Sequence, residues 1–172
     1  MPAQQQAVDV SGYSMTTTIA DIISHIQTNK VQLGITCYDK AAQTEIASFE
    51  KQKKFKLPDD FREFYSFSNG LFSDEDMFRL IPLQEILDNG DNPHLVSKND
   101  FHFAEYMTYC DMWTIDTKNG GEPYSIYNIA QDAITLTSSF TEFIQKFLQG
   151  GVFGGLYPWR QEMQSQQIKN NR

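Results

Sequence analysis

The sequence predicts an α+β fold, a mostly antiparallel sheet flanked by helices in a single domain. A length of 172 residues is typical of one domain with a substantial core. Amphipathic helical stripes occur in the first and last thirds of the chain, and three strand-like runs separated by turn residues follow one another between residues 101 and 129. A hydrophobic content of 40% and an aromatic content of 13% exclude global disorder.

The first helix is predicted over residues 16–30, where threonines can cap its start. Four isoleucines recur there at i, i+3, i+4 and i+7 and form one apolar stripe: Ile19, Ile22, Ile23 and Ile26. Residues 1–14 show no periodicity, so we expect a flexible leader before a domain over residues 15–160. The glutamine-rich residues 161–172 are expected to form a polar tail, either flexible or docked across the surface.

A second helix is predicted over residues 41–56, with Ile46 and Phe49 on its buried side. Its end carries a cluster of four lysines: Lys51, Lys53, Lys54 and Lys56. Unpaired carbonyls and the macrodipole favour cations at the end of a helix. We therefore interpret the lysine cluster as a helix terminus and not as an anion site.

The stretch "FKLPDDFREFYSFSNGLF", residues 55–72, is dense in aromatic side chains. Pro58 suits the first position of a helix, and three aromatic residues then repeat at i, i+3 and i+4: Phe61, Phe64 and Tyr65. Asn69 and Gly70 are expected to close this helix, because both tolerate the left-handed conformation. Most of the aromatic density is thus interpreted as packing.

An acidic loop at residues 73–77 precedes a strand at residues 78–80, which Pro82 ends before a short helix. A polar loop rich in turn residues is expected over residues 88–100. The meander strands are then predicted over residues 101–107, 109–115 and 124–129, with a tight reversal at the glycines before the third. Period-two alternation places Tyr109 and Trp113 on the same face of the second strand.

Residues 133–137 can add a further strand, and the last helix is predicted over residues 138–148. Ser139 and Glu142 have the spacing of a capping box in that helix. The glycine-rich residues 150–155 are expected to end it. A phosphate-binding loop is the weaker interpretation of these glycines, because they follow a helix and lack the Walker lysine.

The charge is concentrated in the middle of the chain. The net charge is −8, but residues 57–116 alone hold thirteen acidic and three basic residues, or −10, which leaves +2 for the remainder. Such a balance argues against binding to nucleic-acid phosphates. The acidic segment is either a solvated surface or a surface that attracts a basic partner.

No pattern of residues predicts an enzyme, a metal or a cofactor. The three histidines have no nucleophile elbow beside them, the acidic run at residues 74–76 lacks the spacing of an EF-hand, and the two cysteines form no CxxC pair. No apolar stretch is long enough to span a bilayer, and the start lacks a signal-peptide pattern. A cytoplasmic protein with no membrane partner is therefore expected.

Four segments in this order resemble the SUKH superfamily, which contains fungal cell-wall synthesis regulators and bacterial immunity proteins of polymorphic toxin systems: "TEIASFEKQKKFKLPDDFREFYSFSNGLF", "FRLIPLQEI", "FHFAEY" and "SSFTEFIQKFL". The resemblance spans residues 43–148. Its most specific element is "LPDDF" followed by "SNG". The chain departs from the usual pattern at Leu71, where a second glycine is common, and at Phe61, where tyrosine is frequent.

The resemblance implies an α+β fold with no catalytic role and a protein as its ligand. Bacterial members are similar in neutralising a toxin domain, often a nuclease, by binding to it. We therefore expect a non-enzymatic immunity protein that binds a basic toxin domain. A regulatory or scaffold domain with an endogenous partner is the alternative, and a hydrolase or small-ligand binder would require a polar pocket with a perturbed acid or histidine.

The candidate partner-binding residues are acidic residues, which can steer a basic partner, and aromatic residues, which can anchor it. They are Asp74, Glu75, Asp76, Asp88, Asp91, Asp100, Tyr109, Trp113 and Tyr127. Core packing is the competing interpretation of the three aromatic residues, since strand aromatics mostly build the buried face of a sheet.

Overall fold

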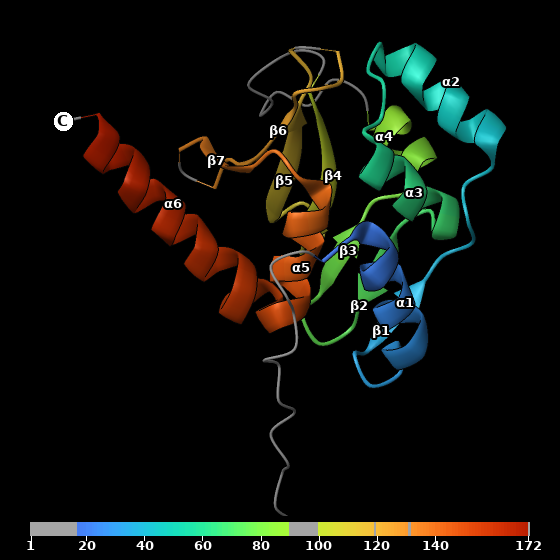
Figure 1. Ribbon diagram of the computed structural model, residues 1–172, viewed down its shortest axis with the longest axis horizontal. Helices are drawn as coiled ribbons and strands as arrows, with labels where there is room; N and C mark the ends of the chain where they lie inside the picture. The colour runs from blue at the N-terminus through green and yellow to red at the C-terminus, as the bar shows by residue number, and fades with distance from the viewer. Residues whose placement is uncertain (1–16, 90–99, 119, 131, 172) are drawn as a thin grey trace, which may run out of the picture.

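The computed structural model describes residues 17–89, 100–118, 120–130 and 132–171. These residues form a seven-stranded sheet in which every neighbouring pair of strands is antiparallel and the strands follow one another in chain order (Figure 1). The strands are β1 (Ile35–Cys37), β2 (Leu71–Ser73), β3 (Phe78–Leu80), β4 (Phe101–Tyr106), β5 (Asp111–Asp116), β6 (Ser125–Asn128) and β7 (Ile134–Thr137). The predicted antiparallel sheet is confirmed.

The helices lie around this sheet, as an α+β fold requires. They are α1 (Ile19–Asn29), α2 (Gln43–Lys53), α3 (Asp59–Phe67), α4 (Leu83–Asp88), α5 (Phe140–Gly150), the π-helix η1 (Gly151–Leu156) and α6 (Tyr157–Asn170). Helices α1, α3 and α5 pack against one another, and α2 packs against α4. Among the described residues, no helix is long and apolar enough to cross a membrane.

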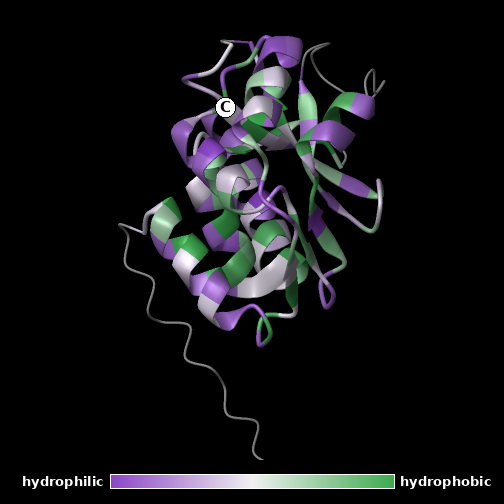
Figure 2. Ribbon diagram, turned by 90° about the vertical axis from the view of Figure 1, so that its right-hand side faces the viewer, coloured by the Kyte–Doolittle hydropathy of each residue, from purple (hydrophilic) through white to green (hydrophobic). Residues whose placement is uncertain are grey.

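Aromatic side chains build the core between α3, α5 and one face of the sheet. Phe78 of β3 stacks on Phe147 of α5 at 4.1 Å between ring centroids and meets Trp113 of β5 edge-on at 5.7 Å. Phe61 of α3 contacts Phe140 of α5 at 4.4 Å. Burial of each such ring contributes about 1.5–3 kcal/mol. Figure 2 shows hydrophobic segments between the helices and the strands, and hydrophilic turns at the edge of the molecule.

Side-chain caps fix where two of these helices begin. Thr18 and Asp21 form a reciprocal capping box at the start of α1. Ser139 Oγ accepts the backbone N–H of Glu142 in α5, as predicted. Asp60 of α3 also accepts the backbone N–H and the hydroxyl of Thr141, each at 2.9 Å, so its carboxylate lies at the positive end of α5.

The Asn69-Gly70 step joins α3 to β2 in a different way from the one predicted. Only Gly70 is left-handed, with φ at 98°, whereas Asn69 acts through its side chain. The Asn69 amide accepts the N–H of Leu83 at the start of α4 and donates to Glu45 of α2, both at 2.9 Å. Asn69, just after α3, thus links α2 to the start of α4.

The chain also departs from the prediction after α5. Helix α5 ends at Gly150, as predicted, but the chain then continues through η1 into α6, which was not predicted. Helix α6 is attached mainly through its first turn, where Arg160 donates to Asn128 Oδ1 at 2.6 Å. Its later residues are largely polar and exposed, and one of them, Gln167, donates to the Thr135 carbonyl of the edge strand β7. Because α6 has no continuous apolar stripe, periodicity did not predict it.

Candidate functional site

Four large apolar side chains are exposed on three segments that meet at one end of the sheet, the β2–β3 turn, the β4–β5 turn and η1 (Figure 1). They are Met77 (48% exposed), Met107 (41%), Tyr109 (48%) and Phe153 (62%). Among the described residues, six large apolar side chains are exposed, so most of them gather here. Exposed apolar side chains that cluster in this way mark interaction sites.

Three contacts hold these segments together. The backbone N–H of Met107 donates to the carbonyl of Met77 at 3.0 Å, which holds the two turns together. The side chain of Asp76 accepts the N–H of Val152 at 3.0 Å, which fixes η1 beside the β2–β3 turn. The ring of Phe153 lies 5.4 Å from the ring of Tyr106, at the end of β4.

Acidic side chains border these apolar groups. Asp74 and Glu75 are exposed in the β2–β3 turn. In the part of the chain that the structure describes, neither forms an ion pair. We call the exposed residues of these segments the turn surface: Asp74, Glu75, Met77, Met107, Tyr109 and Phe153. It combines large apolar side chains with the carboxylates of Asp74 and Glu75, which form no ion pair among the described residues.

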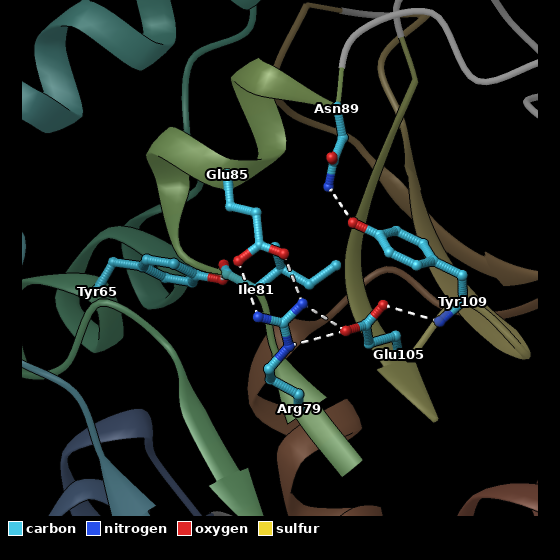
Figure 3. Close-up of polar contacts among 7 residues, drawn as sticks. All are labelled: Tyr65, Arg79, Ile81, Glu85, Asn89, Glu105 and Tyr109. Carbon is cyan, nitrogen blue, oxygen red and sulfur yellow. Dashed lines mark hydrogen bonds and ion pairs between the residues drawn. The ribbon is translucent and has the colours of Figure 1, made fainter. Parts of the chain in front are cut away.

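A half-buried ion cluster lies behind this surface (Figure 3). The guanidinium of Arg79 donates to Glu85 of α4 and to Glu105 of β4, with Nη1–Oε2 and Nε–Oε1 distances of 2.8 Å. Burial opposes the charge of Arg79, but the two carboxylates outweigh it and raise the pKa of the guanidinium. The other oxygen of Glu105 accepts the N–H of Tyr109, whose hydroxyl accepts a hydrogen bond from Asn89 at 2.6 Å. The cluster therefore holds an exposed tyrosine in a fixed position.

The β4–β5 turn is strained. Met107, Thr108 and Tyr109 have φ values of 48°, 39° and 65°, so three consecutive residues with side chains occupy the left-handed region. Such conformations cost about 1–3 kcal/mol each, and they are rarest for β-branched residues such as threonine. Strain of this kind persists where the surrounding structure and a functional requirement impose it. Sequence alternation had predicted strand for most of this turn.

Replacing Thr108 with glycine is expected to raise the free energy of unfolding by about 1 kcal/mol, because glycine adopts this conformation without steric cost. Urea unfolding of the full chain measures the change. Thr135→Gly in β7 is the matched control and is expected to lower stability by about 1 kcal/mol, since Thr135 is an exposed residue within a strand. Equal destabilisation by both substitutions would show that the turn is not strained.

The structure brings several predicted residues to this region. Asp74, Glu75 and Tyr109 belong to the turn surface, although Tyr109 lies in the turn and does not share a strand face with Trp113. Asp76 is half-buried and bound to η1. Asp88 is exposed at the end of α4, next to the residue that contacts Tyr109. Asp91 lies outside the described residues.

Three other predicted residues are buried and have structural roles. Trp113 is completely buried against Phe78, so the core-packing interpretation applies to it. Asp100 is also buried and accepts hydrogen bonds from the N–H of Thr117 at 3.0 Å and from the hydroxyl of Tyr127 at 2.8 Å. Tyr127 is thereby satisfied inside the molecule. None of the three can contact a partner at the surface in this conformation.

The sequence did not predict Met77, Met107 and Phe153 as partner-binding residues. Each lies outside the apolar periodicity of a neighbouring element, and Phe153 lies with Val152 between two pairs of glycines. The feature that could have identified them from the sequence is a bulky apolar side chain in a turn or a glycine-rich segment. Among the described residues, no group of three or more histidine, cysteine, aspartate or glutamate side chains is placed to hold a metal ion.

The family model of the SMI1/KNR4 family (SUKH-1) matches residues 40–146 of the chain. The matched segment includes strands β2 to β7 and both turns of the turn surface, whereas Phe153 and α6 lie beyond it. A comparison with curated proteins found no match.

Proposed function

The chain belongs to the SMI1/KNR4 family (SUKH-1), and we propose that it is a protein-binding domain whose turn surface engages a basic protein partner. The observation that carries this proposal is the gathering of exposed Met77, Met107, Tyr109 and Phe153 beside the carboxylates of one turn. Aromatic residues and methionine are enriched in protein interfaces. No catalytic step is part of the proposal.

The apolar and acidic parts of the turn surface have separate roles in this proposal. The apolar side chains supply most of the affinity, because a few buried anchors dominate the energy of an interface. The acidic residues mainly accelerate the encounter with a positively charged partner. The strained β4–β5 turn presents Tyr109 in a fixed orientation, which lowers the entropy cost of binding.

The more specific form of the proposal is an immunity protein that neutralises a toxin domain of a polymorphic toxin system. A nuclease is one such toxin, because a protein that holds phosphates presents a basic surface that an acidic protein can cover. The concentration of negative charge in residues 57–116 supports a basic partner. Affinity purification of the tagged full chain from its native host would identify a stoichiometric partner.

Reversing the charge of the β2–β3 turn is expected to slow association with that partner. The double variant Asp74→Lys, Glu75→Lys should lower the association rate constant about tenfold at low salt and reduce its salt dependence, because both residues are exposed and unpaired within the described chain. Phe153→Ala should instead raise the dissociation rate constant, since it removes an anchor. Stopped-flow mixing or surface plasmon resonance measures both constants.

Glu63→Lys serves as the control for charge reversal, because Glu63 is exposed on α3 and is not part of the turn surface. It should leave both rate constants nearly unchanged. An effect of Glu63→Lys equal to that of the double variant would mean that net charge alone governs binding. Unchanged rates in the double variant and in Phe153→Ala would place the interface elsewhere.

Deletion of the gene separates the immunity function from regulation of an endogenous partner. An immunity protein is expected to be encoded beside its toxin, and its loss should make the cells sensitive to toxin-producing siblings. Loss of a regulator should instead impair growth in the absence of any toxin producer. That result would support the alternative, a regulatory or scaffold domain.

A further inference from the structure

The α1–β1 turn and the β2–β3 turn lie near the end of α5 (Figure 1). Residues of these three segments line a pocket of about 400 Å³. Most of its lining surface is polar, and the apolar side chains Leu33, Ile35, Phe147 and Leu148 form the remainder. Glu75 and Asp76 line the same pocket. The pocket therefore offers two carboxylates in a mainly polar lining, with a smaller apolar part that includes Leu33 and Leu148.

The electrostatics of the pocket favour a cation. No lysine, arginine or histidine is among its lining residues. Helix α5 ends at the pocket with no basic residue in its last turn, so the negative end of its dipole is not compensated there. Lys146, one turn earlier, instead lies over the ring of Trp159 at 5.7 Å. Asp76 uses only Oδ1 in hydrogen bonds among the described residues, with Val152 as the donor.

We propose that this pocket receives an arginine side chain of the protein partner. The proposal rests on the proposed function and names the partner group that binds beside the turn surface. The three methylenes of arginine would lie along Leu33, Ile35 and Leu148, and the guanidinium would donate to the carboxylates of Glu75 and Asp76. Arginine is enriched among the residues that contribute most to interface energy.

Arginine fits this combination of groups better than lysine does. The guanidinium is more weakly hydrated than an ammonium group, so moving it into a half-enclosed pocket costs less free energy. Its planar fork also donates to two acceptor oxygens at once, and Glu75 and Asp76 are adjacent in the β2–β3 turn. A lysine ammonium would bring a point charge without this directional match.

Peptide titration of the full chain tests the pocket without the partner. The probe is the blocked peptide acetyl-Gly-Ala-Arg-Ala-Gly-amide, and its controls carry citrulline or lysine in place of arginine. In nitrogen-15 correlation spectra, the arginine peptide should shift the amide signals of Gln32, Ser73 and Gly151 saturably. The citrulline peptide, which has a similar shape but no charge, should bind at least about tenfold more weakly.

Two exposed positions give variants that are expected to fold normally. Glu75→Gln should weaken binding of the arginine peptide about fivefold to tenfold, and Gln32→Trp should abolish the saturable shifts by filling the mouth of the pocket. Glu63→Gln on α3 should have no effect. Equal binding of the citrulline or lysine peptide, or an unchanged affinity in Glu75→Gln, would overturn the arginine assignment.

The peptide experiment tests the arginine pocket, and the partner experiment tests the proposed function, so each proposal can be rejected without the other. If the peptide does not bind but Phe153→Ala still accelerates dissociation of the partner, the arginine pocket is rejected and the proposed function stands. If the peptide binds as expected but no variant of the turn surface alters binding of the purified partner, the proposed function is rejected.

Discussion

Replacing Arg79 with methionine is expected to lower the free energy of unfolding by about 3 kcal/mol. Arg79 is the cation shared by Glu85 and Glu105, and the side chain of Glu105 is only 2% exposed. Without Arg79, the buried carboxylate of Glu105 would keep the N–H of Tyr109 as its donor but would lose its opposite charge. Breaking a buried ion pair from one side costs more than the pair itself contributes, because the remaining charge is not compensated.

Urea unfolding of a double-mutant cycle measures this coupling. The double variant Arg79→Met, Glu105→Met should lose less free energy of unfolding than the two single variants lose in sum. The difference should be at least about 1 kcal/mol, because the double variant leaves no isolated charge at this pair. Lys118→Met is the control, since Lys118 is 64% exposed and its pair with Asp116 is a surface contact. Lys118→Met should change the free energy of unfolding by no more than about 0.5 kcal/mol. Additive single effects would show that Arg79 and Glu105 do not stabilise the fold as a pair.

The core of this fold could be predicted from the sequence because its residues are periodic. The isoleucines of α1 and the phenylalanines of α5 repeat with the helical period, and the aromatic residues of α3 do the same. Strands β4, β5 and β6 are bounded by turn residues, so the meander was predictable as well. Strands β1 and β2 have three residues each, and β1 forms only by pairing with β2, which is distant in the sequence.

The candidate site was less predictable, because it depends on which turns come together in space. The acidic β2–β3 turn was recognised from its composition, but its neighbours were not. Phe153 reaches the site through η1, and Met107 reaches it because the β4–β5 turn lies against Met77. Asp100 and Trp113 illustrate the opposite case, since their residue types suit an interface while the fold buries both. Residue type alone therefore predicted Asp74, Glu75 and Tyr109 of the turn surface, but not Met77, Met107 and Phe153.

The second large expected effect concerns the "SNG" element that carries the family resemblance. Gly70→Ala is expected to lower the free energy of unfolding by at least about 3 kcal/mol. Gly70 has φ at 98°, and a β-carbon there would lie 2.4 Å from the carbonyl oxygen of Leu80. Leu80 pairs with Leu71 across β2 and β3, so the added methyl would push the two strands apart at their first paired position. Urea unfolding and thermal melting measure the loss.

Gly154→Ala is the matched control, because the same methyl group is added where it meets nothing. A β-carbon at Gly154 has no neighbouring atom within 4 Å, and the residue lies in the helical segment η1. There, alanine should raise the free energy of unfolding by about 0.5–1 kcal/mol through the lower entropy of the unfolded chain. A loss below about 1 kcal/mol in Gly70→Ala would mean that β2 and β3 can adapt to the methyl group. In that case Asn69 would be the residue through which the "SNG" element stabilises the fold, because its amide joins α2 to α4 whether or not Gly70 is retained.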